Sequence, residues 1–130
     1  MSKYAGVKTY DIANGKGFGV TVFLSGCDAD PKCKGCFNKE AWDKDYGNEI
    51  DVEFMRYIKD ALDNKNITHI SVLGGEPFAQ WNIDTTIKLC SIAHSLGKKT
   101  WVWTWRTIEE INDRLLSVIQ DNVDVLVDGR

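Results

Sequence analysis

The chain has 130 residues, a length that fits one domain with a substantial core. Hydrophobic residues make up 43% of it and charged residues 27%, and its net charge of −3 gives no electrostatic reason to expect nucleic acid or an anionic membrane as a partner. No run approaches the roughly 20 apolar residues of a membrane span, and the first residues lack the apolar core of a signal peptide. We therefore expect a cytoplasmic protein, in which cysteines stay reduced and act as ligands.

Two extended segments are predicted between Val7 and Leu24, on either side of a glycine-rich turn at residues 14–19. The second segment ends in residues 21–24 (Thr-Val-Phe-Leu). This run of β-branched, aromatic and aliphatic residues is typical of a buried strand. This strand leads directly into a loop that is rich in cysteine. The end of a strand is the usual place for a ligand site in parallel α/β proteins.

The cysteine-rich loop runs from Ser25 to Trp42 and holds three of the four cysteines, Cys27, Cys33 and Cys36. Thiolates are soft ligands that suit iron–sulfur clusters, zinc or copper(I). A closed structural zinc site takes four ligands, whereas a cubane cluster held by three thiolates leaves one iron open to another molecule. The cysteines alone leave a cluster and a zinc site equally open, with His69 or His94 as the fourth zinc ligand.

Helices and strands alternate along the rest of the chain. A helix is predicted from Asp51, a good N-cap residue, with an apolar stripe that includes Val52 and Ile58. A helix over residues 84–96 follows a strand at 69–73, and it contains Cys90, which we interpret as a small buried hydrophobe. The remaining elements are a strand at 99–103, a helix that opens with the capping box at 107–110 and runs to about residue 120, and a strand at 123–127.

This alternation predicts an α/β fold built from parallel βαβ units. About four parallel strands and three helices are too few for a complete eight-stranded barrel. We therefore expect a partial, open parallel β/α barrel that occupies residues 1–130 as a single domain. The sequence has no internal repeat, low-complexity tract or linker that would indicate a second domain.

Two further motifs follow predicted strands. Gly74-Gly75-Glu76-Pro77 is a weak signal by itself, but its position suits a small-molecule site, because glycines let backbone groups approach a ligand and Glu76 could add a charge-assisted contact. A simple strand-to-helix turn is the alternative. Trp101, Trp103 and Trp105 alternate and would share one face of a strand, where core packing is the more common role of such a stripe.

These motifs together resemble radical S-adenosylmethionine (SAM) enzymes and, more narrowly, the activating enzymes of anaerobic (class III) ribonucleotide reductases. The resemblance rests on the cysteine group with its following Phe37, and on motifs that keep the family's order over nearly the whole chain. These motifs are Asn14-Gly15-x-Gly17, Gly74-Gly75-Glu76-Pro77, Trp101-Val102-Trp103-Thr104 and Val127-Asp128-Gly129-Arg130. One departure is the five-residue spacing between Cys27 and Cys33, where the family has three residues.

The resemblance implies a partial barrel of the radical SAM type in which Cys27, Cys33 and Cys36 bind a [4Fe–4S] cluster. It also implies that the open iron binds SAM, with contacts from the residues Phe37, Gly74, Gly75, Glu76 and Thr104. Asp128 matches a carboxylate that helps to bind a monovalent cation in related activases. The implied activity is the generation of a glycyl radical on anaerobic ribonucleotide reductase, with a reductant such as flavodoxin.

Other functions remain open at this point. Within the same chemistry, the chain could activate a different glycyl-radical enzyme or act on a small metabolite. From another class, it could be a non-catalytic zinc-binding interaction module. No residue beyond the cluster ligands is predicted to act as a catalytic group.

Overall fold

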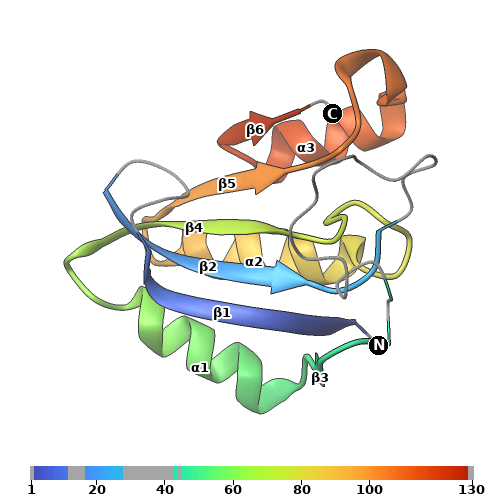
Figure 1. The fold of residues 1–130 in the computed structure, drawn as a ribbon. Helices are drawn as coiled ribbons and strands as arrows, with labels where there is room; N and C mark the ends of the chain where they lie inside the picture. Colours follow the sequence, from blue (N-terminus) through green and yellow to red (C-terminus); the bar gives the residue numbers. More distant parts are fainter. Residues whose placement is uncertain (1, 12–16, 28–42, 44, 129–130) are drawn as a thin grey trace.

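The computed structural model describes residues 2–11, 17–27, 43 and 45–128. Within this part, strands join into one sheet in the order β3-β1-β2-β4-β5-β6 (Figure 1). Their bounds are β1 (Lys3–Asp11), β2 (Phe18–Leu24), β3 (Asn48–Glu49), β4 (Ile67–Gly74), β5 (Lys99–Trp103) and β6 (Val125–Val127). The helices are α1 (Val52–Leu62), α2 (Ile83–Ser95), the short 3-10 helix η2 (Ile108–Glu110) and α3 (Asp113–Asn122).

The strands β2, β4, β5 and β6 pair in parallel, which confirms the predicted α/β class with its open parallel sheet. Parallel neighbours need long crossover connections, and helices α1, α2 and α3 lie in three of these connections. β1 instead pairs with β2 in an antiparallel manner, and the two-residue β3 extends the sheet beyond β1. The sheet therefore has four parallel strands and an antiparallel edge.

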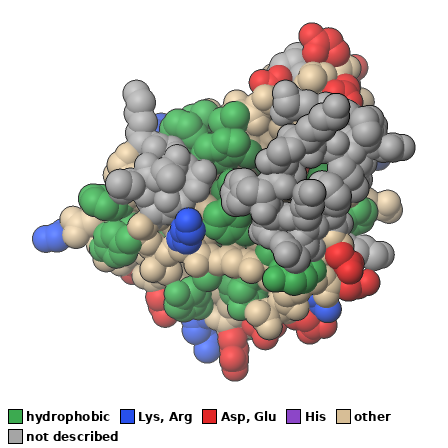
Figure 2. Space-filling view, in the orientation of Figure 1, with side chains coloured by type: hydrophobic (Ala, Val, Ile, Leu, Met, Phe, Trp, Pro, Cys, Tyr) green, Lys and Arg blue, Asp and Glu red, His purple; other side chains and the backbone are tan. Residues whose placement is uncertain are grey.

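The hydrophobic core lies between one face of the sheet and the helices. α2 lies behind the sheet in Figure 1 and packs against β4 and β5, and α1 packs against β2 and β4. The core residues of the two strands alternate, as the two-residue period of a strand requires: they are Val20, Val22, Leu24, Ile70 and Val72. The other face of the sheet is turned toward the viewer in Figure 1, and Figure 2 shows hydrophobic side chains on it.

Helix α1 begins where the sequence predicts, because the Asp51 side chain accepts a hydrogen bond from the Phe54 amide at 2.8 Å. Its buried face includes Ile58, as predicted, but Phe54 takes the place of Val52. Phe54, Ile58 and Leu62 face the core at intervals of four residues, whereas Val52 is 73% exposed. Val52 and Phe54 are about 200° apart around the helix, so a helix that buries Phe54 leaves Val52 in solvent.

The third helix begins later than predicted. The Thr107 amide donates to Glu110 Oε1 at 3.2 Å, which is one of the two contacts of a capping box. The Thr107 hydroxyl donates to the same oxygen at 2.9 Å, the Glu110 amide donates to the Thr107 carbonyl at 3.0 Å, and these residues enclose only η2. The helix α3 begins after Asn112, whose Oδ1 accepts from the Leu115 amide at 2.8 Å. The predicted capping box is thus only half formed, and a second N-cap five residues further on starts the longer helix.

The tryptophan stripe is also shorter than predicted. Trp101 and Trp103 share a face of β5 with ring centroids 5.8 Å apart, as the alternation indicates. Trp105 lies beyond the end of β5, and the Arg106 guanidinium lies over its ring at 5.1 Å. Trp105 therefore belongs to the loop after β5 and not to the sheet.

The sheet depends on a glycine where β2 passes a buried histidine. His69 is 1% exposed, and a Cβ at Gly19, its pairing partner on β2, would lie 2.2 Å from His69 Nε2. Gly6 on β1 offers a contrast, since a Cβ there would meet its nearest atom, in the Phe23 ring, at 3.8 Å. The first distance is a clash, and the second is ordinary contact.

We predict that Gly19→Ala lowers the free energy of unfolding by about 1–3 kcal/mol, because the buried His69 ring must move to accept the methyl group. Gly6→Ala is the matched control and should change the free energy of unfolding by less than about 0.5 kcal/mol. Urea denaturation followed by circular dichroism measures both values. Equal stabilities of the two variants would contradict this account of the β2–β4 contact.

Candidate functional site

The candidate site lies along the edge of the sheet where the parallel strands end (Figure 1). Parallel strands bring their carboxyl ends together, so segments far apart in the sequence meet there. Cys27 follows β2, the Gly74–Glu76 turn ends β4, Thr104 follows β5, and Asp128 follows β6. These residues, predicted as site residues from separate motifs, therefore line one edge of the same sheet.

Ser25 fixes the start of the cysteine loop. Its amide donates to the Lys3 carbonyl at 2.9 Å, and its hydroxyl donates to the Tyr46 carbonyl at 2.6 Å. Its own carbonyl accepts from Asn82 Nδ2 at 2.8 Å and from Trp81 Nε1 at 3.2 Å. The residue is fully buried. Cys27, two residues further on, is thus presented from an anchored backbone.

The turn at Gly74 and Gly75 packs directly on the backbone before Cys27. The Gly75 amide donates to the Leu24 carbonyl, and the Glu76 amide donates to the Gly26 carbonyl, both at 2.7 Å. A Cβ at Gly75 would lie 2.2 Å from the Gly26 oxygen. Gly74 has a φ of +110°, which side chains other than glycine rarely adopt. The close approach of two backbone segments therefore requires both glycines.

The Glu76 side chain is buried and turned inward. Its carboxylate accepts from the Phe78 amide at 2.8 Å, from the Trp105 amide at 2.9 Å, and from the Thr104 hydroxyl at 2.8 and 2.9 Å. Burial raises the pKa of this carboxyl, and the hydrogen bonds and a neighbouring positive charge limit that rise. Glu76 thus connects the turn after β4 to the loop after β5.

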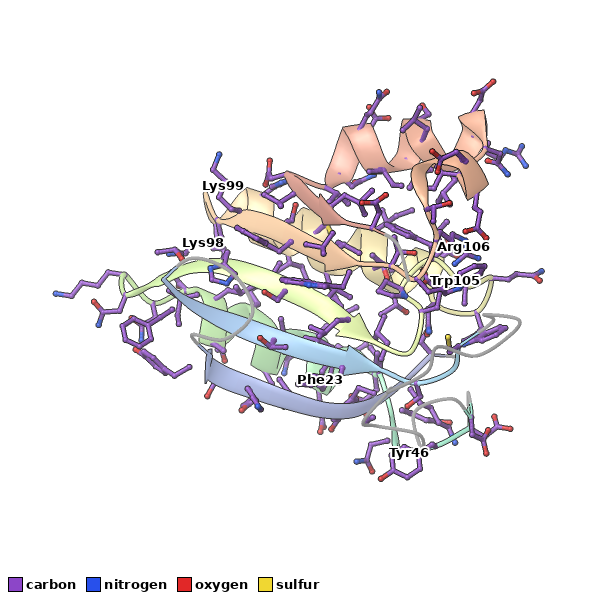
Figure 3. The ribbon with its side chains drawn as sticks, turned by 45° about the horizontal axis from the view of Figure 1, so that its top comes forward. Phe23, Tyr46, Lys98, Lys99, Trp105 and Arg106 are labelled. Carbon is purple, nitrogen blue, oxygen red and sulfur yellow. The ribbon has the colours of Figure 1, made fainter. Side chains whose placement is uncertain are left out.

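Arg106 supplies the neighbouring charge. Its Nη1 lies 2.9 Å from Glu76 Oε2, and its side chain is only 15% exposed. Figure 3 shows Arg106 beside Trp105 at the carboxyl end of β5, while Lys98 and Lys99 mark the opposite edge of the sheet. An ion pair this shielded from water is strongly destabilised if one partner is removed. The positions of Glu76 and Arg106 therefore depend on each other.

Thr104 and Asp128 occupy different environments at this edge. Thr104 is 6% exposed and its amide donates to the Val127 carbonyl at 3.0 Å, so it joins the ends of β5 and β6. Asp128 is exposed and directly follows β6. Phe37 lies outside the described residues. The contacts of these residues with a cosubstrate or cation remain predictions.

The two histidines lie at the other edge of the sheet. His69 pairs with Gly19, five residues before the Leu24–Gly74 pair, which is a separation of about 16 Å along the strands. His94 Nε2 is 2.9 Å from Asp124 Oδ2, which accepts from the Thr100 amide at the start of β5. Neither histidine can share a metal ion with Cys27. The zinc site with a histidine as fourth ligand is therefore wrong for this fold.

The available thiols fit a cluster held by three cysteines. Cys27 is partly exposed at the edge of the sheet, whereas Cys90 is fully buried within α2, where burial raises the pKa of its thiol to about 12. Cys33 and Cys36 lie outside the described residues, as does the 28–32 segment of unusual length. In the part of the chain that the structure describes, no three histidine, cysteine or acidic side chains form a metal-binding group. The three loop cysteines stay the predicted ligand set, and their thiolates suit iron and sulfide.

Sequence reasoning missed three residues that shape this edge, namely Ser25, Asn82 and Arg106. Ser25 gave the weakest signal, because its contacts are made to distant backbone carbonyls. Asn82 stands at a helix N-terminus, where its usual role would be that of a cap. Arg106 is a basic residue next to a tryptophan, a pattern that by itself points only to a surface contact.

Comparisons with known proteins agree with this arrangement. Residues 13–130 match the family described as 4Fe-4S single cluster domain. The chain is 36% identical over 124 residues to the anaerobic ribonucleoside-triphosphate reductase-activating protein of Escherichia coli (strain K12), covering 92% of this chain and 79% of that protein. The proteins of the same name from Pasteurella multocida (strain Pm70) and Enterobacteria phage T4 are 33% and 30% identical, covering 92% of this chain and 78% and 75% of theirs.

The family match includes all three cysteines of the loop and each described strand except β1, and the match to the Escherichia coli protein covers 92% of the chain. They confirm the resemblance that the motifs indicated. This chain belongs to the family of the anaerobic ribonucleoside-triphosphate reductase-activating proteins and carries a 4Fe-4S single cluster domain.

Proposed function

We propose that this chain is a radical SAM activase that generates a glycyl radical on an anaerobic ribonucleotide reductase. The observation that carries the proposal is the union of two features at one sheet edge, namely a cysteine loop of a 4Fe-4S domain and the glycine turn packed against it. A cluster with an open iron, loaded with SAM and reduced by one electron, supplies a 5′-deoxyadenosyl radical that can take a hydrogen atom from a glycine Cα.

The chain's own residues would hold the cluster and SAM next to each other. Cys27, Cys33 and Cys36 provide the cluster thiolates, and Cys27 is anchored through Ser25. The Gly74–Glu76 turn presents backbone carbonyls beside this loop, where an ammonium group of SAM could be bound. The buried Glu76 serves this contact indirectly in our proposal, because its carboxylate is already engaged by the groups that follow β5. Phe37 would pack against the adenine, and Asp128 would help to bind a monovalent cation.

The sheet face opposite the helices offers a surface for a protein substrate. Phe23 pairs with Leu73 on β4, and Trp103 pairs with Val127 on β6. All four are at least partly exposed, and the row that they form lies next to the carboxyl edge. Figure 3 shows Phe23 on this face of β2. A loop of the reductase would approach the site over this row, and a reductant such as flavodoxin would deliver the electron from outside it.

The first prediction concerns the metal. Anaerobic reconstitution should give about four irons and four sulfides per chain, because three thiolates and an open iron complete a cubane cluster. Cys27→Ala, Cys33→Ala and Cys36→Ala should each abolish iron uptake, measured by iron analysis and absorption spectroscopy. Cys90→Ala is the control and should keep the full iron content, since that thiol is buried in α2. Stoichiometric zinc with no iron uptake under strict anaerobiosis would overturn the cluster.

The second prediction concerns the activity itself. The reconstituted and reduced protein, mixed with SAM and the anaerobic reductase of the same genome, should generate the doublet signal of a glycyl radical in electron paramagnetic resonance. Without the reductase, cleavage to 5′-deoxyadenosine and methionine should be slow. Fast cleavage with no radical on the reductase would leave the chemistry in place but show that the partner is a different glycyl-radical enzyme or a small metabolite.

A further inference from the structure

Asn82 occupies the N-cap position of α2 without acting as a cap. Its backbone is helical, at φ −112° and ψ −19°, and its side chain makes no capping hydrogen bond. Asparagine is among the preferred N-cap residues because its side-chain oxygen accepts from an amide of the first turn. Asn112 does this at the start of α3, through the Leu115 amide. The side chain of Asn82 is therefore used for something else.

The amide nitrogen of Asn82 lies between the two turns of the candidate site. Nδ2 donates to the Ser25 carbonyl at 2.8 Å and to the Glu76 carbonyl at 3.1 Å, and the whole residue is 0% exposed. The two contacts fix the orientation of the amide, since a flipped group would place its oxygen against two carbonyls. One side chain thus ties the backbone before Cys27 to the backbone that follows Gly74 and Gly75.

The oxygen end of the amide is placed differently. Asn82 Oδ1 is buried and has no hydrogen-bond partner among the described residues. A buried acceptor without a partner is unfavourable and calls for an explanation. Asn82 makes no capping hydrogen bond, and its Nδ2 instead binds two carbonyls. This combination indicates that Asn82 is needed to fix the distance between the two turns and not to stabilise α2.

We infer that Asn82 is a positioning residue, which sets the separation between the turn that presents Cys27 and the Gly74–Glu76 turn that receives SAM. The inference rests on the proposed function for the identity of the ligand. It does not require a direct contact between Asn82 and the ligand. Removal of the Nδ2 donor removes the side-chain link between the Ser25 and Glu76 carbonyls, so the glycine turn is held against the segment before Cys27 only by the backbone hydrogen bonds of Gly75 and Glu76 and opens more often.

The test begins with the metal-free protein, by residue-resolved amide hydrogen exchange. Asn82→Ala should speed exchange at the Gly75 and Glu76 amides by about tenfold relative to the Val72 amide, which lies in the central strand and reports global unfolding. Asn82→Asp should act similarly at neutral pH, because a carboxylate cannot donate to two carbonyls. Asn112→Ala is the matched control: it removes a true helix cap and should leave the ratio unchanged. An unchanged ratio in Asn82→Ala, or an equal rise in the control, overturns the inference.

The second readout is the affinity of the cluster-loaded protein for SAM, from titration followed by electron paramagnetic resonance of the reduced state. Asn82→Ala should keep its full iron content and bind SAM about tenfold more weakly, while Asn112→Ala should bind it as the wild type does. Faster exchange with unchanged SAM affinity would show that Asn82 is merely structural and overturn the positioning role. A wild-type protein that fails to bind SAM would instead overturn the proposed function, with the exchange result unaffected.

Discussion

The structure depends on the contact between two backbone turns at the carboxyl edge of the sheet. The Leu24 and Gly26 carbonyls accept from the Gly75 and Glu76 amides at 2.7 Å, so the turn after β4 continues the pairing of β2 and β4 beyond the regular strands. Such close approach leaves no space for a Cβ at Gly75. The start of the cysteine loop and the Gly-Gly-Glu-Pro motif are therefore parts of one backbone assembly, although Glu76 follows Gly26 by 50 residues (76 − 26) and β3, α1 and β4 lie between them.

A second set of contacts carries this assembly to the other strands. Glu76 accepts hydrogen bonds from Thr104 and Trp105 and pairs with Arg106, which places the loop after β5 against the glycine turn. The Thr104 amide in turn donates to Val127 at the end of β6. Because these groups are buried, each hydrogen bond that is lost would leave a polar group without water to replace it. These contacts thereby connect the edge of the sheet from β2 to β6.

The sequence allowed prediction of the α/β class, the bounds of β5 and the cap at Asp51. These features depend on local chemistry or on a two-residue period. The burial of Phe54 in place of Val52 on α1 and the later start of α3 were not predicted, because Tyr4 stacks on Phe54 at 4.0 Å and Asn112 competes with the capping box as a helix start. Such outcomes depend on packing and on competition between caps.

The candidate site could be predicted in part. Cysteine spacing and the motif order led to Cys27, the glycine turn and the edge on which they lie. The inward orientation of Glu76 could not be read from the sequence, because it depends on donors 28 to 29 residues away that only the folded sheet brings near. The same holds for Asn82, whose two acceptors lie 57 and 6 residues away. Long-range polar contacts of this kind leave no periodic signal.

The central claim is that the 5′-deoxyadenosyl radical, formed from SAM on this chain, takes a hydrogen atom from a glycine of the reductase. The most direct test uses reductase prepared with glycine deuterated at Cα, mixed under reducing, anaerobic conditions with the reconstituted protein and unlabelled SAM. Mass spectrometry of the 5′-deoxyadenosine then follows the transferred atom. The account predicts that deuterium appears in 5′-deoxyadenosine in proportion to the glycyl radical formed. Formation of the radical with 5′-deoxyadenosine that contains no deuterium would contradict it.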